Sequence, residues 1–344
     1  MKKLLLRALL VILALTLIIV PLSACGNKGD DDPVETTATT VSDKPDENLE
    51  MKIYLLNGTT ALGASKLIVD AKAGNTDMNY KIETFAAADQ ITGAIVSGEC
   101  VIAALPTNAA ANLYKKSEGK IQLLAINTLG VLYLLDNGEG ITDFESLKGK
   151  TIYLPGAGSN PEFITAALLE ANGLTPDDVT LDTTTYPSPD ALATAVTAGE
   201  AKLAVLPEPK VTVVRSGNKD VKVAMDFTAE WEEIYGENTL AQGCLVVNTA
   251  FAKEHPAELA KFLDDYKASV EYIAAGSDEA INTIVEAGIL PKAPIAKAAL
   301  PNCNICFIEG KPMKEAISVF YEKLHASNSK SIAAIPDDAF YFAR

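Results

Sequence analysis

A sequence unit that occurs twice constrains the fold of this chain more than any other feature. The dipeptide Gly-Glu stands at residues 98–99 and again at 199–200, and each copy precedes a short apolar run that ends in Leu-Pro, at Pro106 and Pro207. The match continues upstream at the same offset, where DQITGAIVSGE corresponds to DALATAVTAGE, and a glycine loop precedes each copy, LNGT and LPGA. Two copies of one βα unit predict two similar α/β lobes. A cleft between such lobes is where small ligands are usually held.

The first 24 residues have the features of an export signal. Basic residues precede an apolar run at residues 8–20, and small residues precede Cys25. Because the run is shorter than the roughly 20 residues that span a bilayer as a helix, we expect no membrane-spanning helix in the mature chain. The residues Leu-Ser-Ala-Cys at 22–25 resemble the bacterial lipobox, which implies a lipid on the Cys25 thiol and cleavage before it. The alternative is an ordinary secretory signal with a chance cysteine.

The segment after Cys25 is too polar to fold. Residues 26–50 contain acidic and threonine-rich stretches and almost no large apolar side chain, so we expect residues 25–50 to form a disordered tether. Removing the three positive charges of the leader from a formal net charge of −16 gives −19. We expect no nucleic-acid partner, because nucleic-acid binding draws on clustered Lys and Arg.

The rest of the chain alternates between strand-like and helix-like runs. We predict strands at 51–56, 81–85, 101–105, 121–126, 131–135, 151–154, 179–186, 203–207, 221–225 and 244–248, and helices at 61–74, 89–97, 107–116, 161–174, 189–198, 255–275, 278–287 and 311–325. This alternation predicts an α/β fold with two Rossmann-like lobes, whose mixed, mainly parallel sheets are covered on both faces. We assign residues 51–129 plus 244–344 to lobe one and residues 130–243 to lobe two. The two chain crossings between them, near 127–130 and 242–244, would form a hinge.

Several segments resemble a known family. They are NGTTALGASKL, NTLGVLYLL, LKGKTIYLPGAGSNPE, QGCLVVN and the terminal PDDAFYF. With the export signal and the lipobox they resemble an ABC-transporter solute-binding lipoprotein of the nitrate, sulfonate and thiamine-pyrimidine type, which has the type 2 periplasmic-binding fold. No single motif is diagnostic, but their order is specific and covers essentially the whole chain after the leader.

The resemblance implies a role in uptake. Such a protein captures a small solute outside the cell and delivers it to an ABC permease in the membrane. The lipid on Cys25 would anchor it to the outer face of the bacterial cytoplasmic membrane. The ligand would be a sulfonate, nitrate, a pyrimidine or a flavin-like compound, and the sequence does not choose among them. We expect a monomer.

Four loops that follow predicted strands carry the candidate ligand-binding residues. Ligands of open α/β sheets lie beyond the carboxyl ends of strands, where helices that start after the loops direct free N–H groups toward anionic oxygens. The candidates on these loops are Asn57, Gly58, Thr59, Thr60, Pro106, Thr107, Asn108, Gly158, Ser159, Asn160 and Glu208. The alternative for Thr59, Thr107 and Ser159 is that each caps its own helix.

Aromatic side chains and one acid extend this set. Tyr186 follows a lobe-two strand and is the best candidate for an apolar wall, with Trp231 as a second; packing in the core or on the surface is the alternative for both. The carboxylate of Glu208 would bind an amine, pyrimidine or amidine-like group through charge-assisted hydrogen bonds. The alternative is a solvated loop acid.

The cysteines do not predict a metal or redox site. Cys303 and Cys306 form one CxxC without a second, which favours a buried pair of thiols or a local disulfide beside a strand. The other two cysteines of the folded part are Cys100 and Cys244. We expect no metal and no cofactor.

Catalytic motifs are weak. GAGSNP has Pro161 where the dinucleotide fingerprint needs its third glycine. The SxxK pair at Ser216 falls in a predicted loop without the accompanying β-lactamase-type motifs. With two histidines in the chain, acid–base catalysis has poor candidates. We therefore expect a binding protein without catalytic residues. A lipid-anchored secreted hydrolase or transferase, and a sensor subunit that presents its ligand to a membrane kinase, are the alternatives.

Overall fold

The computed structural model describes residues 44–344. Cys25, the export signal and most of the predicted tether lie outside the described residues. The end of the predicted tether is bonded to the fold, because the Asp46 amide donates to Glu258 Oε1 at 2.9 Å. No helix among residues 44–344 has the length and apolar character that a membrane span needs.

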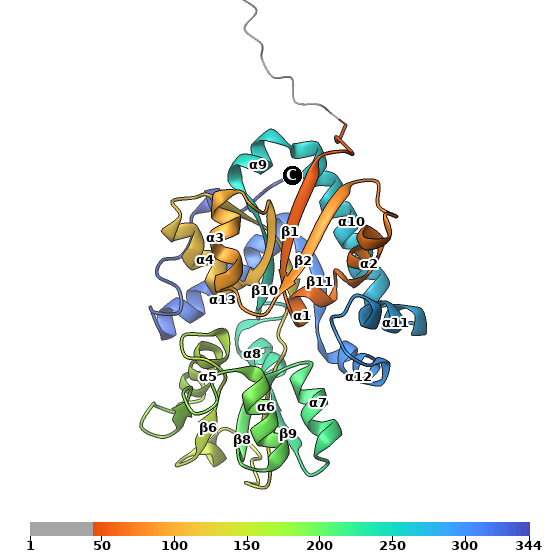
Figure 1. Cartoon of the computed structure of the whole chain (residues 1–344). Helices are drawn as coiled ribbons and strands as arrows, with labels where there is room; N and C mark the ends of the chain where they lie inside the picture. Colours follow the sequence, from red (N-terminus) through yellow and green to blue (C-terminus); the bar gives the residue numbers. More distant parts are fainter. Residues whose placement is uncertain (1–43) are drawn as a thin grey trace, which may run out of the picture. The chain divides into compact units, whose positions relative to one another are not determined.

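Six strands form the first sheet (Figure 1). They are β1 (Glu50–Leu56), β2 (Asn79–Phe85), β3 (Ile102–Pro106), β4 (Ile121–Thr128), β10 (Gly243–Asn248) and β11 (Ile305–Glu309), in the order β11-β4-β10-β3-β1-β2. β1 pairs in parallel with β2 and β3, whereas β10 runs antiparallel to β3 and β4. The sheet is therefore mixed. Strands β1, β2 and β3 form its parallel part, and the later strands β10 and β11 run antiparallel to the strands beside them.

Alternate residues of β1 bury on opposite faces of this sheet. Ile53 and Leu55 pack in a cluster with Phe262 of helix α10 (Pro256–Ala274), and Tyr54 packs in a second cluster with Ile95 of helix α3 (Asp89–Ser97). Successive side chains of a strand point to opposite faces, and each fully buried aliphatic or aromatic side chain stabilises the fold by about 1.5–3 kcal/mol. Helices therefore cover both faces, as the continuous apolar character of the strands predicts.

Five strands form the second sheet. They are β5 (Leu132–Asp136), β6 (Thr151–Tyr153), β7 (Thr180–Asp182), β8 (Leu203–Pro207) and β9 (Lys222–Asp226), in the order β7-β6-β8-β5-β9. β6 is parallel to β7 and β8, and β5 is antiparallel to β8 and β9. The predicted class, α/β with two mixed sheets, is confirmed.

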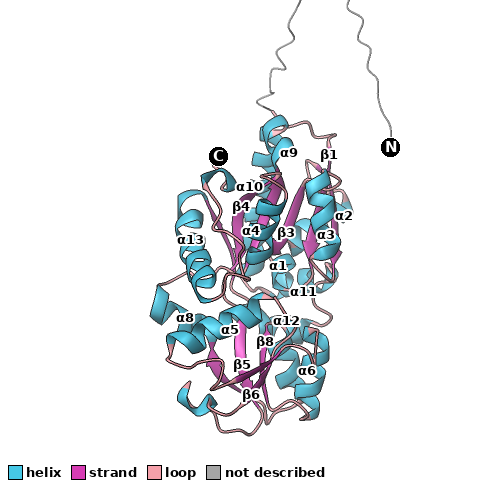
Figure 2. Cartoon of the chain, turned by 90° about the vertical axis from the view of Figure 1, so that its left-hand side faces the viewer, coloured by secondary structure: helices cyan, strands magenta, loops and turns pink. Residues whose placement is uncertain are grey.

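Helices surround both sheets (Figure 2). Those in the sequence segments that carry the first sheet are α1 (Thr59–Leu62), α2 (Ser65–Ala73), α3 (Asp89–Ser97), α4 (Thr107–Lys116), α9 (Thr249–Glu254), α10 (Pro256–Ala274), α11 (Asp278–Glu286), α12 (Ala293–Ala299) and α13 (Gly310–Ser327). Those in the segment that carries the second sheet are α5 (Asn160–Ala171), α6 (Pro189–Ala198), α7 (Lys210–Gly217) and α8 (Phe227–Tyr235). Short 3-10 turns lie at Glu145–Leu147, Leu300–Asn302 and Asp338–Phe340.

The two chain crossings between the sheets are hydrogen-bonded to each other. Gln242 on the second crossing donates its amide N–H to Thr128 O at 3.1 Å. Its side-chain Oε1 accepts from the amide of Val131 at 2.6 Å. Nearby, α13 packs against α5, and Trp231 of α8 lies 5.6 Å from Phe320 of α13, ring centre to ring centre. One core cluster thus contains residues from both sheets.

The predicted helix at 61–74 is two helices. The chain turns at Gly63, where an added Cβ would stand 2.9 Å from Val270 Cγ2. The carbonyl of Gly63 accepts a hydrogen bond from Ser269 Oγ at 2.7 Å. Close packing against α10 therefore separates α1 from α2. The predicted end of the helix is confirmed, because Gly74 has φ 71° and caps α2 in the left-handed conformation.

The predicted strand at 179–186 ends after three residues, at Asp182. Its Oδ1 accepts from the amides of Thr184 and Thr185, both at 2.9 Å. A short acid that bonds to the following backbone turns the chain. The hydroxyl and amide of Thr185, with the amide of Thr184, lower the pKa of Asp182 to about 2.

Five helices and strands of the described chain were not predicted, among them the short helices α9 and α12. The segment around Trp231 is helix α8, whose N-cap Asp226 accepts from the Thr228 amide at 2.9 Å. Ser216 lies in helix α7, so its assignment to a loop was wrong. Strand β11 follows Cys303 and pairs with β4, so the chain after β10 is not entirely helical. The capping acid Asp226 was visible in the sequence and would have predicted α8.

Candidate ligand-binding site

The first residues of α4 and α5 bind the same carbonyl oxygen. The amide N–H of Thr107 donates to Gln242 O at 3.2 Å, and Nδ2 of Asn160 donates to the same atom at 3.4 Å. α4 follows β3 of the six-stranded sheet, and α5 lies between β6 and β7 of the five-stranded sheet. Gln242 lies on the second crossing between the sheets. Two of the four predicted loops therefore meet at this crossing, which we call the α4–α5 junction.

Neither these helices nor α1 are capped by the residues expected to cap them. No side chain caps α1, α4 or α5. Thr107 Oγ1 donates instead to Ala241 O at 2.6 Å. The Ser159 hydroxyl is directed at Pro155 O and Gly156 O, at 2.9 and 2.7 Å. The alternative that Thr59, Thr107 and Ser159 cap their own helices is wrong.

Two asparagines at the α4–α5 junction have unpaired polar atoms. Asn108 and Asn160 are each 6% exposed. The Asn108 side chain makes no hydrogen bond within residues 44–344. Oδ1 of Asn160 is in addition fully buried, and among the described residues it shares this lack of a partner with Thr228 Oγ1. Buried polar groups are normally paired, and an unpaired one costs about 1–3 kcal/mol. The buried, unpaired oxygen of Asn160 is therefore the strongest indication of a binding site at this junction.

The first loop contributes exposed and buried positions. Asn57 is exposed and Thr59 is half-buried, and neither side chain makes a hydrogen bond within the described chain. Thr60 is buried and donates Oγ1 to Leu56 O at 2.7 Å. Its carbonyl accepts from Asn127 Nδ2 at 3.0 Å. The side chain of Thr60 therefore holds the turn, whereas those of Asn57 and Thr59 remain free. Gly58 precedes α1 with φ 109°.

Two further candidates shape the loops through their backbones. Pro106 ends β3 and is the N-cap of α4. Gly158 has φ 74°, and its amide donates to Glu162 Oε2 at 2.6 Å. Both residues set the entry into a helix of the junction.

Glu208 is not a solvated loop acid. The residue is buried, with 3% of its surface exposed. The carboxylate accepts from the amide and the hydroxyl of Thr212, at 3.1 and 2.9 Å. Burial raises the pKa of Glu208, against the hydrogen bonds from Thr212 and Asn302 and the charge of Arg215, which lower it. A contact between Glu208 and a ligand stays a prediction.

The two aromatic candidates differ in their surroundings. Trp231 is fully buried, and its indole Nε1 donates to Thr239 Oγ1 at 3.1 Å. Trp231 therefore packs in the core, which was the alternative to a role in the wall of the site. Tyr186 is half-buried, and its ring meets Tyr153 edge to face with centres 5.3 Å apart. Partial burial, followed by the charge of Glu200, raises the pKa of Tyr186.

The candidate nucleophiles are not placed beside a base. The hydroxyl of Ser159 bonds to carbonyl oxygens, and that of Ser216 donates to Thr212 O at 2.7 Å. A carbonyl oxygen does not take up a proton as a general base does. The thiols of the described residues are free, and burial raises the pKa of Cys100 and Cys306 to about 12. Within residues 44–344, no group of three His, Cys, Asp or Glu is arranged to hold a metal ion.

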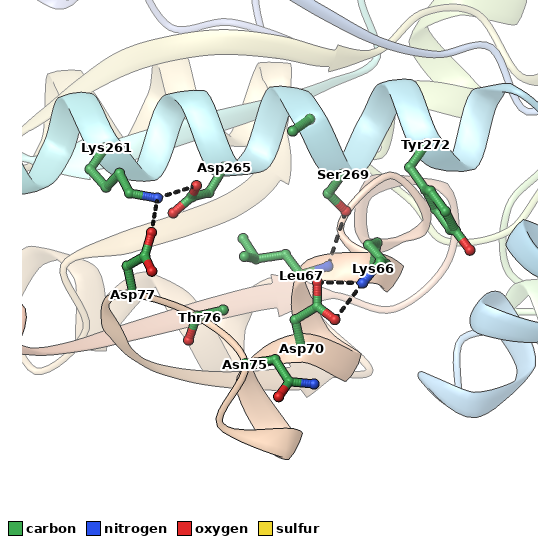
Figure 3. A pocket seen from close by; sticks show the side chains of 11 residues that line it. Lys66, Leu67, Asp70, Asn75, Thr76, Asp77, Lys261, Asp265, Ser269 and Tyr272 are labelled. Atoms are coloured by element: carbon green, nitrogen blue, oxygen red, sulfur yellow. Dashed lines mark hydrogen bonds and ion pairs between the residues drawn. The ribbon is translucent and has the colours of Figure 1, made fainter.

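A separate pocket of about 330 Å³ lies between α2 and α10 (Figure 3). Lys66 pairs with Asp70 at 2.6 Å. Lys261 pairs with Asp265 at 2.6 Å and with Asp77 at 3.3 Å. Both lysines of this pocket are paired with its aspartates. The pocket therefore offers a ligand no unpaired positive charge. It contains none of the predicted site residues.

A family model and several solved structures match the chain. Residues 120–280 match the model described as NMT1/THI5 like. No curated protein sequence matches. An ABC transporter protein from Parabacteroides distasonis has a similar structure, with a TM-score of 0.73 and 22% identity over 87% of this chain and 100% of that one.

Two further structures are of named binding proteins. The periplasmic aliphatic sulphonate binding protein SsuA from Escherichia coli has a TM-score of 0.68 and 13% identity, over 86% of this chain and 92% of its own. The ligand binding component of an ABC-type import system from Staphylococcus aureus, solved with zinc bound, has a TM-score of 0.65 and 14% identity, over 86% and 97%. The suspected likeness to NMT1-like and SsuA-type proteins is supported by this family model and these structures, and the periplasmic-binding fold predicted from the sequence is confirmed. At these identities the structures show the fold alone.

Proposed function

We propose that the chain is the extracytoplasmic solute-binding lipoprotein of an ABC importer. It holds a small polar or heterocyclic solute between lobe one, residues 51–129 plus 244–344, and lobe two, residues 130–243. It delivers this solute to a membrane permease. A lipid on Cys25 anchors it to the outer face of the cytoplasmic membrane, and it acts as a monomer.

The observation that carries the proposal is the α4–α5 junction. Helix N-termini favour anionic and acceptor groups through their free N–H groups and partial positive charge. Here the amide N–H of Thr107 and the side-chain Nδ2 of Asn160, from the first turns of two helices in different lobes, bond to the carbonyl of Gln242. Oδ1 of Asn160 lies beside them without a partner among residues 44–344. A ligand that bonds to both ends is held by both lobes, so its binding energy favours the closed arrangement.

Ligand-dependent stabilisation tests the proposal. Native mass spectrometry of the purified protein should detect a co-purified small molecule. Returning that molecule to the stripped protein should raise its melting temperature, since a ligand at a hundred times its Kd stabilises by about 2.7 kcal/mol. Asn108→Ala should lose most of this shift. Asn75→Ala should keep it, because Asn75 is an exposed asparagine outside the junction.

Two alternatives make different demands. A lipid-anchored hydrolase or transferase requires turnover of an ester or amide panel that Ser159→Ala abolishes, and the carbonyl-bound hydroxyl of Ser159 argues against it. A sensor subunit would bind ligand as a transport protein does. Genes for a permease and an ATPase beside this one would favour transport, and a gene for a membrane kinase would favour sensing.

A further inference from the structure

We infer that the ligand carries a hydrogen-bond donor, an amino group or a ring N–H, beside a hydrogen-bond acceptor, and that Asn160 selects for the donor. This inference rests on the proposed function, because it assigns the chemistry of the solute held at the α4–α5 junction. Three features of the junction carry it: the orientation of one amide, the helix ends around it and the charges on the loops.

The orientation of the Asn160 amide is set by Gln242. Its Nδ2 lies 3.4 Å from Gln242 O. A main-chain carbonyl accepts hydrogen bonds and does not donate them, so the nitrogen and not the oxygen of the amide faces it. The Asn160 oxygen, Oδ1, is left buried and without a partner among residues 44–344. Only a donor can pair with it.

The groups around Asn160 call for an acceptor as well. The first turns of α4 and α5 offer N–H groups that no side chain caps. Asn108, 6% exposed and unpaired within the described chain, offers one further donor and one further acceptor. A ligand that satisfies this junction therefore presents an acceptor to the helix ends and a donor to Oδ1 of Asn160. Amides and amino-heterocycles have such neighbouring groups.

Acceptor-only anions do not match the junction. Nitrate and alkanesulfonates bear acceptor oxygens, so an oxygen of either would lie against the lone pairs of Asn160 Oδ1. The four loops, at 57–60, 106–108, 156–160 and 206–209, contain no Lys or Arg. Lys210, which follows the last loop, is paired with Asp190. No cation of these loops offsets the desolvation of a full negative charge.

Matched pairs of compounds test the inference on the purified wild-type protein. The probes are nicotinamide, cytosine and aminopyrimidine, each beside its N,N-dimethyl analogue, together with nitrate and methanesulfonate. We expect at least one donor-bearing compound to raise the melting temperature, and its dimethyl analogue to bind on the order of tenfold or more weakly. In Asn160→Leu this preference should fall to about one, because the unpaired acceptor is gone. The wild-type comparison stands even if Asn160→Leu does not fold.

The outcomes separate this inference from the proposed function. Binding of nitrate or methanesulfonate at least as tight as that of the amino compounds would overturn the inference and leave a solute-binding protein in place. A co-purified ligand without an N–H or amino group would do the same. If neither the panel nor any co-purified molecule stabilises the protein, both are wrong.

Discussion

The side-chain amide of Asn304 donates a hydrogen bond to the carbonyl oxygen of Gly130, 2.5 Å away. The main-chain oxygen of Asn304 accepts from the amide of Leu129 at 3.0 Å. Asn304 itself has a left-handed φ of 40°, which asparagine tolerates better than most residues. A single residue of the turn before β11 thus bonds to two residues of the first crossing between the sheets.

Substitutions at Asn304 should separate its two contributions. Asn304→Gly keeps the left-handed backbone and loses the amide bond, so we expect the free energy of unfolding to fall by about 1 kcal/mol. Asn304→Ala adds the strain of a left-handed alanine and should cost a further 1–2 kcal/mol or so. Urea unfolding measures both. Equal stability of the two variants would show that the backbone conformation contributes nothing.

Gly130 should not tolerate a side chain. An added Cβ would stand 2.2 Å from Thr228 Oγ1 and 2.6 Å from Leu240 Cδ2. Since overpacking typically costs about 1–3 kcal/mol, we expect Gly130→Ala to lower the free energy of unfolding by at least that amount.

Gly93 provides the matched control. It lies in α3, and an added Cβ there meets nothing within 4 Å. Gly93→Ala should raise the stability by about 0.5–1 kcal/mol, because alanine favours the helix. Chemical denaturation of both variants decides the matter, and a Gly130→Ala variant as stable as the wild type would contradict the close contact.

The regular helices and strands could be predicted from the sequence, but the places where they break could not. The helix at 89–97 and the strand at 203–207 have the observed bounds, because each has a clear apolar pattern and a glycine or proline at its end. The break at Gly63 was not predictable from local sequence, because the hydroxyl of Ser269 takes the place of the helical bond there: it accepts from the Leu67 amide and donates to Gly63 O, 206 residues away in the sequence. Tertiary contacts of this kind do not appear in periodicity.

Trp231 should stabilise the core without touching the ligand. It is the only tryptophan of the chain and is fully buried against Phe320. Trp231→Ala should cost about 3–5 kcal/mol, measured by denaturation followed by far-UV circular dichroism. Trp231→Phe should keep the ligand affinity of the wild type. A tenfold loss of affinity in a stable Trp231→Phe would restore Trp231 as a wall of the site.

The candidate site was predictable in position more than in chemistry. Thr107 and Asn160 were predicted as site residues because their loops follow strands, and in the structure both bond to Gln242 O. That the Thr107 hydroxyl bonds to Ala241, and that Oδ1 of Asn160 stays unpaired, depends on side-chain directions set by the crossing. Sequence spacing does not contain these directions. Ligand contacts by the individual residues stay predictions.

The buried carboxyl of Glu208 should make stability fall as pH rises. Burial raises its pKa above the usual 4.5, so the folded protein binds this proton more tightly than the unfolded chain. The destabilisation begins as pH rises through 4.5 and is complete above the folded pKa. In Glu208→Gln this dependence is removed. The stability of the variant relative to the wild type should therefore rise with pH and then level off, measured by urea unfolding between about pH 4 and 8.

Asp182 should show the opposite pH dependence. Hydrogen bonds from Thr185 and Thr184 lower its pKa from 3.8 to about 2, so the unfolded chain binds this proton more tightly. The stabilisation is present above 3.8 and is lost as pH falls through about 2. Asp182→Asn should thus lower stability at neutral pH, and this deficit should shrink in acid. Asp182 ends β7 because its carboxylate accepts from the next backbone amides. If the loss of stability in Asp182→Asn were the same at every pH, the charge of the carboxylate would not be what stabilises this turn.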